Sequence, residues 1–174
     1  MRSVEPQAHR QRVNVLGALR QDGKLVWCTQ QRPTVRNDVI AFLDRLSEVP
    51  HAGPCIVVID NAAIHKGEVM DSKRQQWAAQ GLYLYYLPPY SPELNRIEIL
   101  WKQAKYFWRR FCSLKGEELL NEVNSIFNAF GTDFTINFAC LLRSLRGNSD
   151  VAAVVFYLAM ILNGVVGGLA GVVT

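Results

Sequence analysis

Two acidic residues stand where an acid is chemically informative. Asp60 ends the apolar run "CIVVID", and Glu98 lies in "NRIEILW", just after the proline-rich stretch "LPPYSPEL". A carboxylate that follows a buried strand is costly to remove from water unless a positive charge balances it. If the two acids converge at one edge of a sheet, their hard oxygen ligands suit Mg²⁺ or Mn²⁺. The pair is therefore a candidate metal site.

Each acid also has a simpler interpretation. Asp60 and Asn61 form a good turn-starting pair, so Asp60 could serve only to begin a turn. Asn95 and Glu98 match a capping box, in which Asn95 caps a helix and Glu98 occupies its third position. The residues around Asp60 do not exclude the turn, and those around Glu98 do not exclude the capping box. Between the two acids there is room for one helix and one strand, which favours their convergence.

The surrounding pattern predicts the elements that would position these acids. Residues 12–20 and 24–30 are β-rich runs joined by an Asp22-Gly23 turn, which predicts a hairpin. The periodicity then predicts a helix at 37–49 with Asn37 as its cap, a buried strand at 55–60, a helix at about 67–80, a buried strand at 82–88, and helices at 95–111 and 116–129. Such a chain favours an α/β domain with a mixed sheet. Ligands of these sheets bind beyond the carboxyl ends of the strands, where Asp60 stands.

Composition excludes several classes of protein. The chain has 174 residues, of which 49% are hydrophobic and 20% charged, so it suits one globular domain rather than a disordered chain. Its four cysteines form no CxxC pair, which argues against a zinc site or a disulfide framework. A net charge of +4 is compatible with a polyanionic partner.

The C-terminal segment has a different character. Residues 151–174 contain no charged residue and are long enough to cross a bilayer, which needs about 20 apolar residues. Arg143 and Arg146 precede this segment, as positive charges often flank a membrane span. We therefore assign residues 140–174 to an apolar tail of unknown role. Membrane association and a sticky extension are its alternatives.

The two acidic stretches together resemble a known family. "DNAAIH" at 60–65, followed by "LPPYSPELNRIEILW" at 87–101, is similar to the endonuclease domain of insertion-sequence transposases of the mariner-like superfamily, in the branch called the IS-six-thirty type. The resemblance runs from about residue 9 to 139 and includes "FGTDFTINFA" near its end. It implies an RNase H-like three-layer fold for residues 1–139, with a mixed sheet flanked by helices. It also implies DNA cleavage at transposon ends and strand transfer into target DNA.

The resemblance also implies roles for individual residues. Such enzymes use two aspartates and a glutamate to hold two Mg²⁺ or Mn²⁺ ions, which activate a water or a DNA 3′-hydroxyl. Asp60 matches the second aspartate and Glu98 the closing glutamate, so both are expected metal ligands and catalytic residues. Asn61 and His65 also match motif positions, and we expect them to orient the site.

The sequence departs from the family in one important respect. The first aspartate of the family lies on a strand ahead of the hairpin, and the chain begins too late to include that strand. Neither Glu5 nor Asp22 is a credible substitute. We therefore expect an N-terminally truncated fold with impaired activity and an open sheet edge at residues 12–20. Arg96 also replaces the proline that usually follows Asn95.

Basic residues suggest how DNA would be held. Lys102, Lys105 and Arg109 share one face of the predicted helix with Glu98, which suits phosphate contacts. A merely solvated helix face is the alternative. The leading hypothesis is thus a transposase catalytic domain in a bacterial cytoplasm, associated with the nucleoid and able to form a homodimer or synaptic assembly. A non-catalytic DNA-binding or oligomerising module and a membrane-associated protein are the competing hypotheses.

Overall fold

The computed structural model describes residues 12–50, 53–108, 114, 116–131 and 154–164. Its strands are β1 (Arg12–Arg20), β2 (Leu25–Gln30), β3 (Cys55–Ile59), β4 (Leu82–Tyr86) and β5 (Val154–Gly164). Its helices are α1 (Arg36–Ser47), α2 (Glu68–Ala79), α3 (Ile97–Trp108) and α4 (Gly116–Ala129), with short 3₁₀ helices η1 (Ala63–His65) and η2 (Pro92–Leu94). All the elements that the sequence predicts before residue 130 are present, with ends shifted by a few residues. The burial predicted for the strand at 82–88 is wrong, because β4 is an edge strand on which Tyr83 and Tyr85 are exposed.

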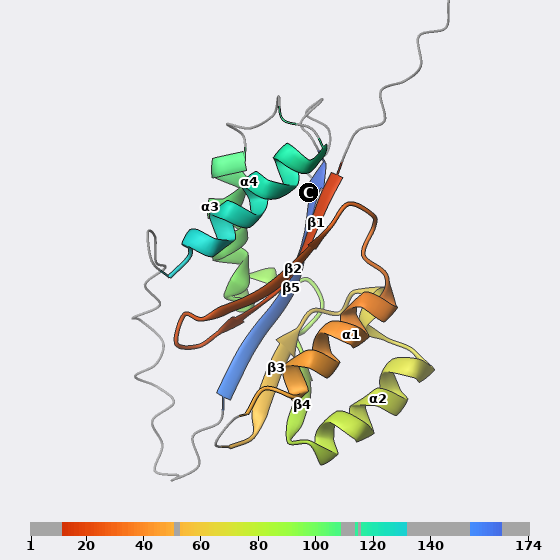
Figure 1. Ribbon diagram of the computed structural model, residues 1–174. Coiled ribbons are helices and arrows are strands. Elements are labelled where there is room, and N and C mark those ends of the chain that lie inside the picture. Colours follow the sequence, from red (N-terminus) through yellow and green to blue (C-terminus); the bar gives the residue numbers. More distant parts are fainter. Residues whose placement is uncertain (1–11, 51–52, 109–113, 115, 132–153, 165–174) are drawn as a thin grey trace, which may run out of the picture.

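The five strands form one mixed sheet in the order β2-β1-β5-β3-β4. β1 is antiparallel to both β2 and β5, whereas β3 is parallel to both β5 and β4. Figure 1 shows α1 and α2 on one side of this sheet and α3 and α4 on the other. Each helical pair covers its own cluster of buried apolar side chains. The predicted α/β class, with its mixed sheet between helical layers, is confirmed.

The central strand of the sheet is β5, which the sequence analysis had assigned to an apolar tail. β5 pairs with β1 from Arg12↔Gly164 to Arg20↔Phe156 and with β3 from Cys55↔Val154 to Ile59↔Leu158. The open edge expected at β1 is therefore wrong, because β5 fills that position. Among the described residues, no helix has the length and apolar character to cross a membrane.

The apolar composition of β5 follows from its position between two helical layers. Phe156 and Leu158 are buried in the cluster beneath α1 and α2, and Ala159 is buried in the cluster beneath α3 and α4. A strand that is covered on both faces reads as a continuous apolar run instead of an alternating one. The same physical reason explains the run "CIVVI" of β3.

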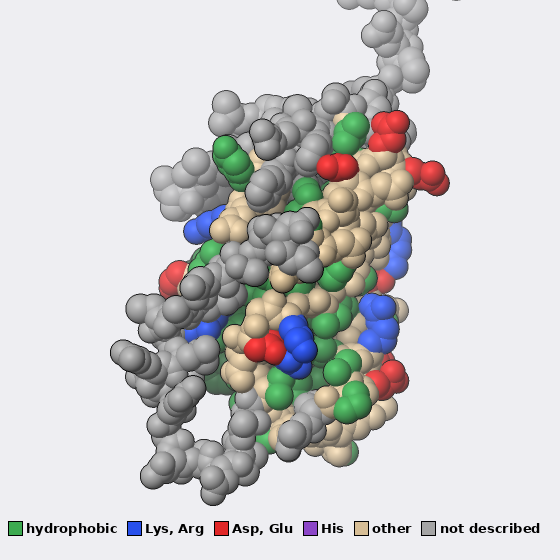
Figure 2. Space-filling view, turned by 60° about the vertical axis from the view of Figure 1, so that its left-hand side comes forward, with side chains coloured by type: hydrophobic (Ala, Val, Ile, Leu, Met, Phe, Trp, Pro, Cys, Tyr) green, Lys and Arg blue, Asp and Glu red, His purple; other side chains and the backbone are tan. Residues whose placement is uncertain are grey.

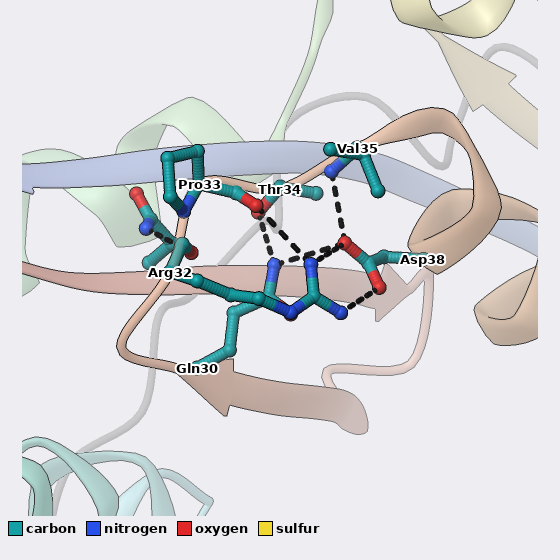
Figure 3. A network of polar contacts seen from close by, with 7 residues as sticks. Gln30, Arg32, Pro33, Thr34, Val35 and Asp38 are labelled. Carbon is teal, nitrogen blue, oxygen red and sulfur yellow. Dashed lines mark hydrogen bonds and ion pairs between the residues drawn. The ribbon is translucent and has the colours of Figure 1, made fainter.

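A group of polar contacts joins β2 to the start of α1 (Figure 3). Asp38, in the first turn of the helix, accepts hydrogen bonds from the backbone N–H of Val35 at 2.8 Å and from the guanidinium of Arg32 at 2.7 and 2.5 Å. The side-chain amide of Gln30 also donates to Asp38, at 3.3 Å. The helix begins one residue before Asn37, so the predicted Asn37 cap is wrong. The Asp38 carboxylate instead accepts a hydrogen bond from the backbone N–H of Val35, which has no partner within the helix.

We predict that Asp38→Asn destabilises the fold in a pH-dependent way. The hydrogen bond from Arg32 is the main reason that the pKa of Asp38 lies well below its usual range. Its stabilising contribution is therefore complete above pH ~4, the pKa of an unfolded aspartate, and is lost as the pH falls further. At pH 7 we expect a loss of about 1 kcal/mol, because the Arg32 side chain is 59% exposed and its charge is screened.

Urea unfolding of both chains between pH 3 and pH 7 measures this difference. Arg32→Gln is the matched control, because it removes the ion pair and leaves the bond between Val35 and Asp38. It should show a smaller loss at pH 7. A difference between wild type and Asp38→Asn that stays constant over this range would contradict the prediction.

Candidate active site

Asp60 follows the last residue of β3, and its carboxylate is fixed by two donors. The backbone N–H of Ala62 lies 2.9 Å from Oδ1, and Nδ1 of His65 lies 2.7 Å from the same oxygen. The bond from His65 holds the pKa of Asp60 below its usual range, against the effect of burial. Asp60 is thus charged at neutral pH, and its side chain remains 49% exposed.

His65 and Asn61 connect Asp60 to the neighbouring strand. His65 is fully buried in η1, and its backbone carbonyl accepts a hydrogen bond from the hydroxyl of Tyr86 at 2.7 Å. The Nδ1 atom faces a carboxylate and must therefore carry a proton. Asn61 donates from its side-chain amide to the carbonyl of Leu87, the residue after β4. Both residues hold the Asp60 turn in place, and neither presents a free proton-transfer group to the cleft.

Glu98 lies in the first turn of α3, but it forms no capping box with Asn95. The backbone N–H of Asn95 donates to the carbonyl of Pro92 at 2.9 Å, so it does not return to Glu98. The Asn95 side chain, which is 2% exposed, instead donates to the carbonyl of Leu158 in β5 at 3.0 Å. Within the described part of the chain, no hydrogen bond or ion pair engages the Glu98 carboxylate. Asn95 thus links the start of α3 to the central strand, and the Glu98 carboxylate is not used to cap the helix.

The two carboxylates are close enough to influence each other. Burial raises the pKa of Glu98, and the negative charge of Asp60 raises it further, whereas Lys105 and Lys102 lower it. Glu98 is half-buried and comes from α3, while Asp60 comes from the end of β3. The charge of one predicted site acid thus acts on the other. A cation placed between them would relieve the repulsion and the cost of burial.

The basic residues proposed to contact DNA are only partly described. Lys102 and Lys105 are exposed on α3, beside Glu98, whereas Arg109 lies outside the described residues. On the face shown in Figure 2, Lys and Arg side chains are scattered among acidic ones and form no continuous basic band there. Among the described residues, Lys105 and Lys102 are the positive charges that lower the pKa of Glu98.

An open cleft of about 490 Å³ adjoins Asp60. One wall holds Asp60, Asn61 and Lys66, and the other is the turn after β4, which contains Tyr90 and three prolines. The sequence predicts no role for Lys66 or Tyr90. The proline cluster around Tyr90 was visible, but only the structure shows that this turn faces Asp60.

The neighbouring position on β5 carries a methyl group instead of a third acid. The parallel register pairs Ile59 with Leu158, and its continuation places Ala159 beside Asp60. Ala159 is 1% exposed and belongs to the cluster beneath α3, so it lies on the same face of the sheet as Glu98. Within the described residues, no group of three or more His, Cys, Asp or Glu side chains gathers as a metal site. Asp60 and Glu98 thus offer the carboxylate oxygens that a hard divalent ion prefers, but they offer only two such groups.

The mixed five-stranded sheet and its helical layers are consistent with an RNase H-like fold. The chain belongs to the DDE superfamily endonucleases, because the model of that family matches residues 1–120. This match includes Asp60 and Glu98 and ends before β5. Neither a curated protein nor a solved structure gave a match to the chain.

Proposed function

We propose that this chain is a transposase-type DNA endonuclease domain in which Asp60 and Glu98 hold a divalent cation against a DNA phosphate. One observation carries the proposal. Two carboxylates come from separate elements, the end of β3 and α3, the charge of Asp60 raises the pKa of Glu98, and the Glu98 carboxylate has no hydrogen bond or ion pair within the described residues. Mg²⁺ or Mn²⁺ is the ion that these oxygen ligands favour.

Other residues near the two acids position them or contact DNA. A bound divalent ion would polarise the phosphate and lower the pKa of an attacking water. His65 fixes one oxygen of Asp60, and Asn61 ties the Asp60 turn to the end of β4. Asn95 sets the position of α3, and hence of Glu98, relative to β5. Lys102 and Lys105 contact flanking phosphates, and Arg109 extends the same series in the sequence.

We further propose that this metal site binds its ion weakly and that the chain therefore cleaves DNA poorly. The position beside Asp60 on β5 is Ala159, which has no side-chain oxygen to offer a metal ion. Two carboxylates bind a divalent ion less tightly and fix its position less well than three. An insertion-sequence origin, transfer of the cut strand into target DNA and assembly of two copies around the DNA are further parts of this proposal.

Metal-induced stabilisation tests the proposed site directly. We expect millimolar Mn²⁺ to raise the melting temperature of the wild-type chain, and expect Asp60→Asn and Glu98→Gln to lose that increase. Without metal, Glu98→Gln should melt above the wild type, because it removes a half-buried charge that Asp60 repels. Glu93→Gln is the matched control, since Glu93 is an exposed acid in η2 that should not affect the increase.

Nicking of a transposon-end duplex, measured in parallel, tests the predicted weakness of cleavage. An equal Mn²⁺ effect in all four chains would rule out Asp60 and Glu98 as the metal site. Strong nicking by the wild-type chain in Mg²⁺, abolished in Asp60→Ala, would instead support the site and refute the impairment.

A second candidate function is DNA binding without cleavage, which the methyl group of Ala159 specifically favours. A chain with this function could still inhibit an active relative by pairing with it on DNA. Salt-sensitive binding to duplex DNA, without any metal-dependent nicking, would distinguish this function from the first.

A further inference from the structure

Tyr90 combines two features that a folded chain normally avoids. Its side chain is 100% exposed, so the ring gains nothing from burial. Its backbone φ is +59°, and it is the one non-glycine residue with a positive φ in the part of the chain that the structure describes. Side chains other than those of Gly, Asn and Asp rarely adopt this region. Packing among the residues that the structure describes explains neither feature.

The turn that carries Tyr90 is held firmly against the candidate site. Pro88 and Pro89 precede Tyr90, Pro92 follows it, and each proline fixes its own φ. The backbone N–H of Leu87 donates to the carbonyl of Ile59 at 2.9 Å, and the Leu87 carbonyl accepts the amide of Asn61. The same two contacts flank Asp60 in the sequence. The ring of Tyr90 is thus displayed at a defined place relative to Asp60.

The cleft offers three kinds of group to a ligand. Asp60 lines it with a carboxylate, Lys66 with an exposed ammonium group, and Tyr90 with an aromatic ring. A nucleotide presents the complementary groups, because its phosphate suits Lys66 and a cation on Asp60, and its base presents a flat π face. Aromatic side chains stack on unpaired bases of any sequence, whereas bases inside a duplex have no free face.

We propose that Tyr90 stacks on an unpaired nucleobase next to the phosphate that lies at Asp60. This inference rests on the proposed nucleic-acid function and adds a contact that fixes which phosphate reaches the site. The strained φ and the exposed ring are then requirements of the contact with DNA. Lys66 binds the phosphate on the Asp60 side of that base.

Fluorescence of 2-aminopurine in a short single-stranded DNA tests the stacking contact. The full chain is titrated with this DNA in EDTA, so that no divalent ion contributes to binding. We expect Tyr90→Ala to weaken binding about tenfold, within the range that loss of one base–aromatic stack produces, and Tyr90→Trp to retain it. Tyr90→Gly should lose the same affinity yet melt at a higher temperature, because glycine adopts positive φ without strain.

Tyr83→Ala is the matched control. Tyr83 is also an exposed tyrosine, but it lies on β4 in a separate groove beside α2, and its removal should leave binding unchanged. Wild-type affinity in Tyr90→Ala, or an equal loss in Tyr83→Ala, would overturn the inference. The inference would also be overturned if Tyr90→Ala weakened binding to duplex DNA and left binding to single-stranded DNA unchanged. The assay contains no metal, so a failed stacking contact with intact Mn²⁺ stabilisation would refute this inference and leave the proposed function standing.

Discussion

A chain that ends at residue 150 should show no cooperative unfolding transition, whereas a chain that ends at Gly164 should unfold as the full chain does. The first truncation removes β5, the strand between β1 and β3. The second removes only the residues that follow it. We expect the first chain to be collapsed or aggregated and the second to retain the sheet.

The size of this effect follows from what β5 contributes. Its backbone pairs with two neighbours, and each internal hydrogen bond adds about 0.5–1.5 kcal/mol net. Phe156 and Leu158 are almost fully buried, and each such side chain contributes about 1.5–3 kcal/mol. Together these contributions are comparable to the ~5–15 kcal/mol by which domains are normally stable. Without β5, β1 and β3 would also expose unpaired edges to other chains.

Circular dichroism during urea unfolding distinguishes the two truncated chains, and sedimentation reports their aggregation. If the chain that ends at residue 150 unfolds with the same midpoint and slope as the full chain, then β5 contributes nothing to the sheet. In that case the sequence-based assignment of residues 140–174 to a separate tail would be correct.

Ala159→Asp should convert the proposed two-carboxylate metal site into a stronger one. Ala159 lies beside Asp60 on β5 and on the side of the sheet that faces α3, so an aspartate there would add a third carboxylate oxygen group. Without metal the substitution should be destabilising, because it buries a charge close to two others. With Mn²⁺ we expect most of that loss to be recovered.

We expect Mn²⁺ to bind Ala159→Asp at least tenfold more tightly than the wild type, equivalent to ~1.4 kcal/mol. Titration calorimetry measures this affinity, and nicking of duplex DNA in Mn²⁺ should increase with it. Ala159→Asn is the matched control, since it has the same shape with no charge and should improve neither property. Equal Mn²⁺ affinity in the aspartate variant and the wild type would show that β5 does not lie beside the metal ligands.

Much of the fold could be predicted because its signals are local. Asp22-Gly23 marked the hairpin turn, and the apolar run before Asp60 marked a strand buried on both faces. The parallel pairing of β3 and β4, between Asp60 and the helix of Glu98, agrees with the predicted order of elements, whereas a shared metal site of the two acids stays a prediction. β5 could not be assigned in this way. An apolar run without alternation suits a buried strand, a membrane helix or a sticky tail, and only its partners β1 and β3 decide between them.

The two incorrect predictions of a helix cap have a similar cause. Asn95 fitted a local capping box, but its amide donates to Leu158, a residue far away in the sequence. Likewise, Asn37 looked like a helix cap, whereas Asp38 receives the contacts from Val35 and Arg32. In both cases the local sequence offered a plausible cap, and the contact that forms involves another residue. The sequence shows the candidates, and the packing of distant elements selects one.

The position of β5 also has a consequence for the order of events during synthesis. A chain made from its N-terminus produces β1, β3 and the acids of the site long before the strand that joins the two halves of the sheet. At about 5–20 residues per second, these halves wait several seconds for their shared partner. Pairs so distant along the chain close slowly and raise the contact order. The nascent protein therefore passes through an obligatory stage with two unpaired strand edges, when chaperones or a second nascent copy can reach them.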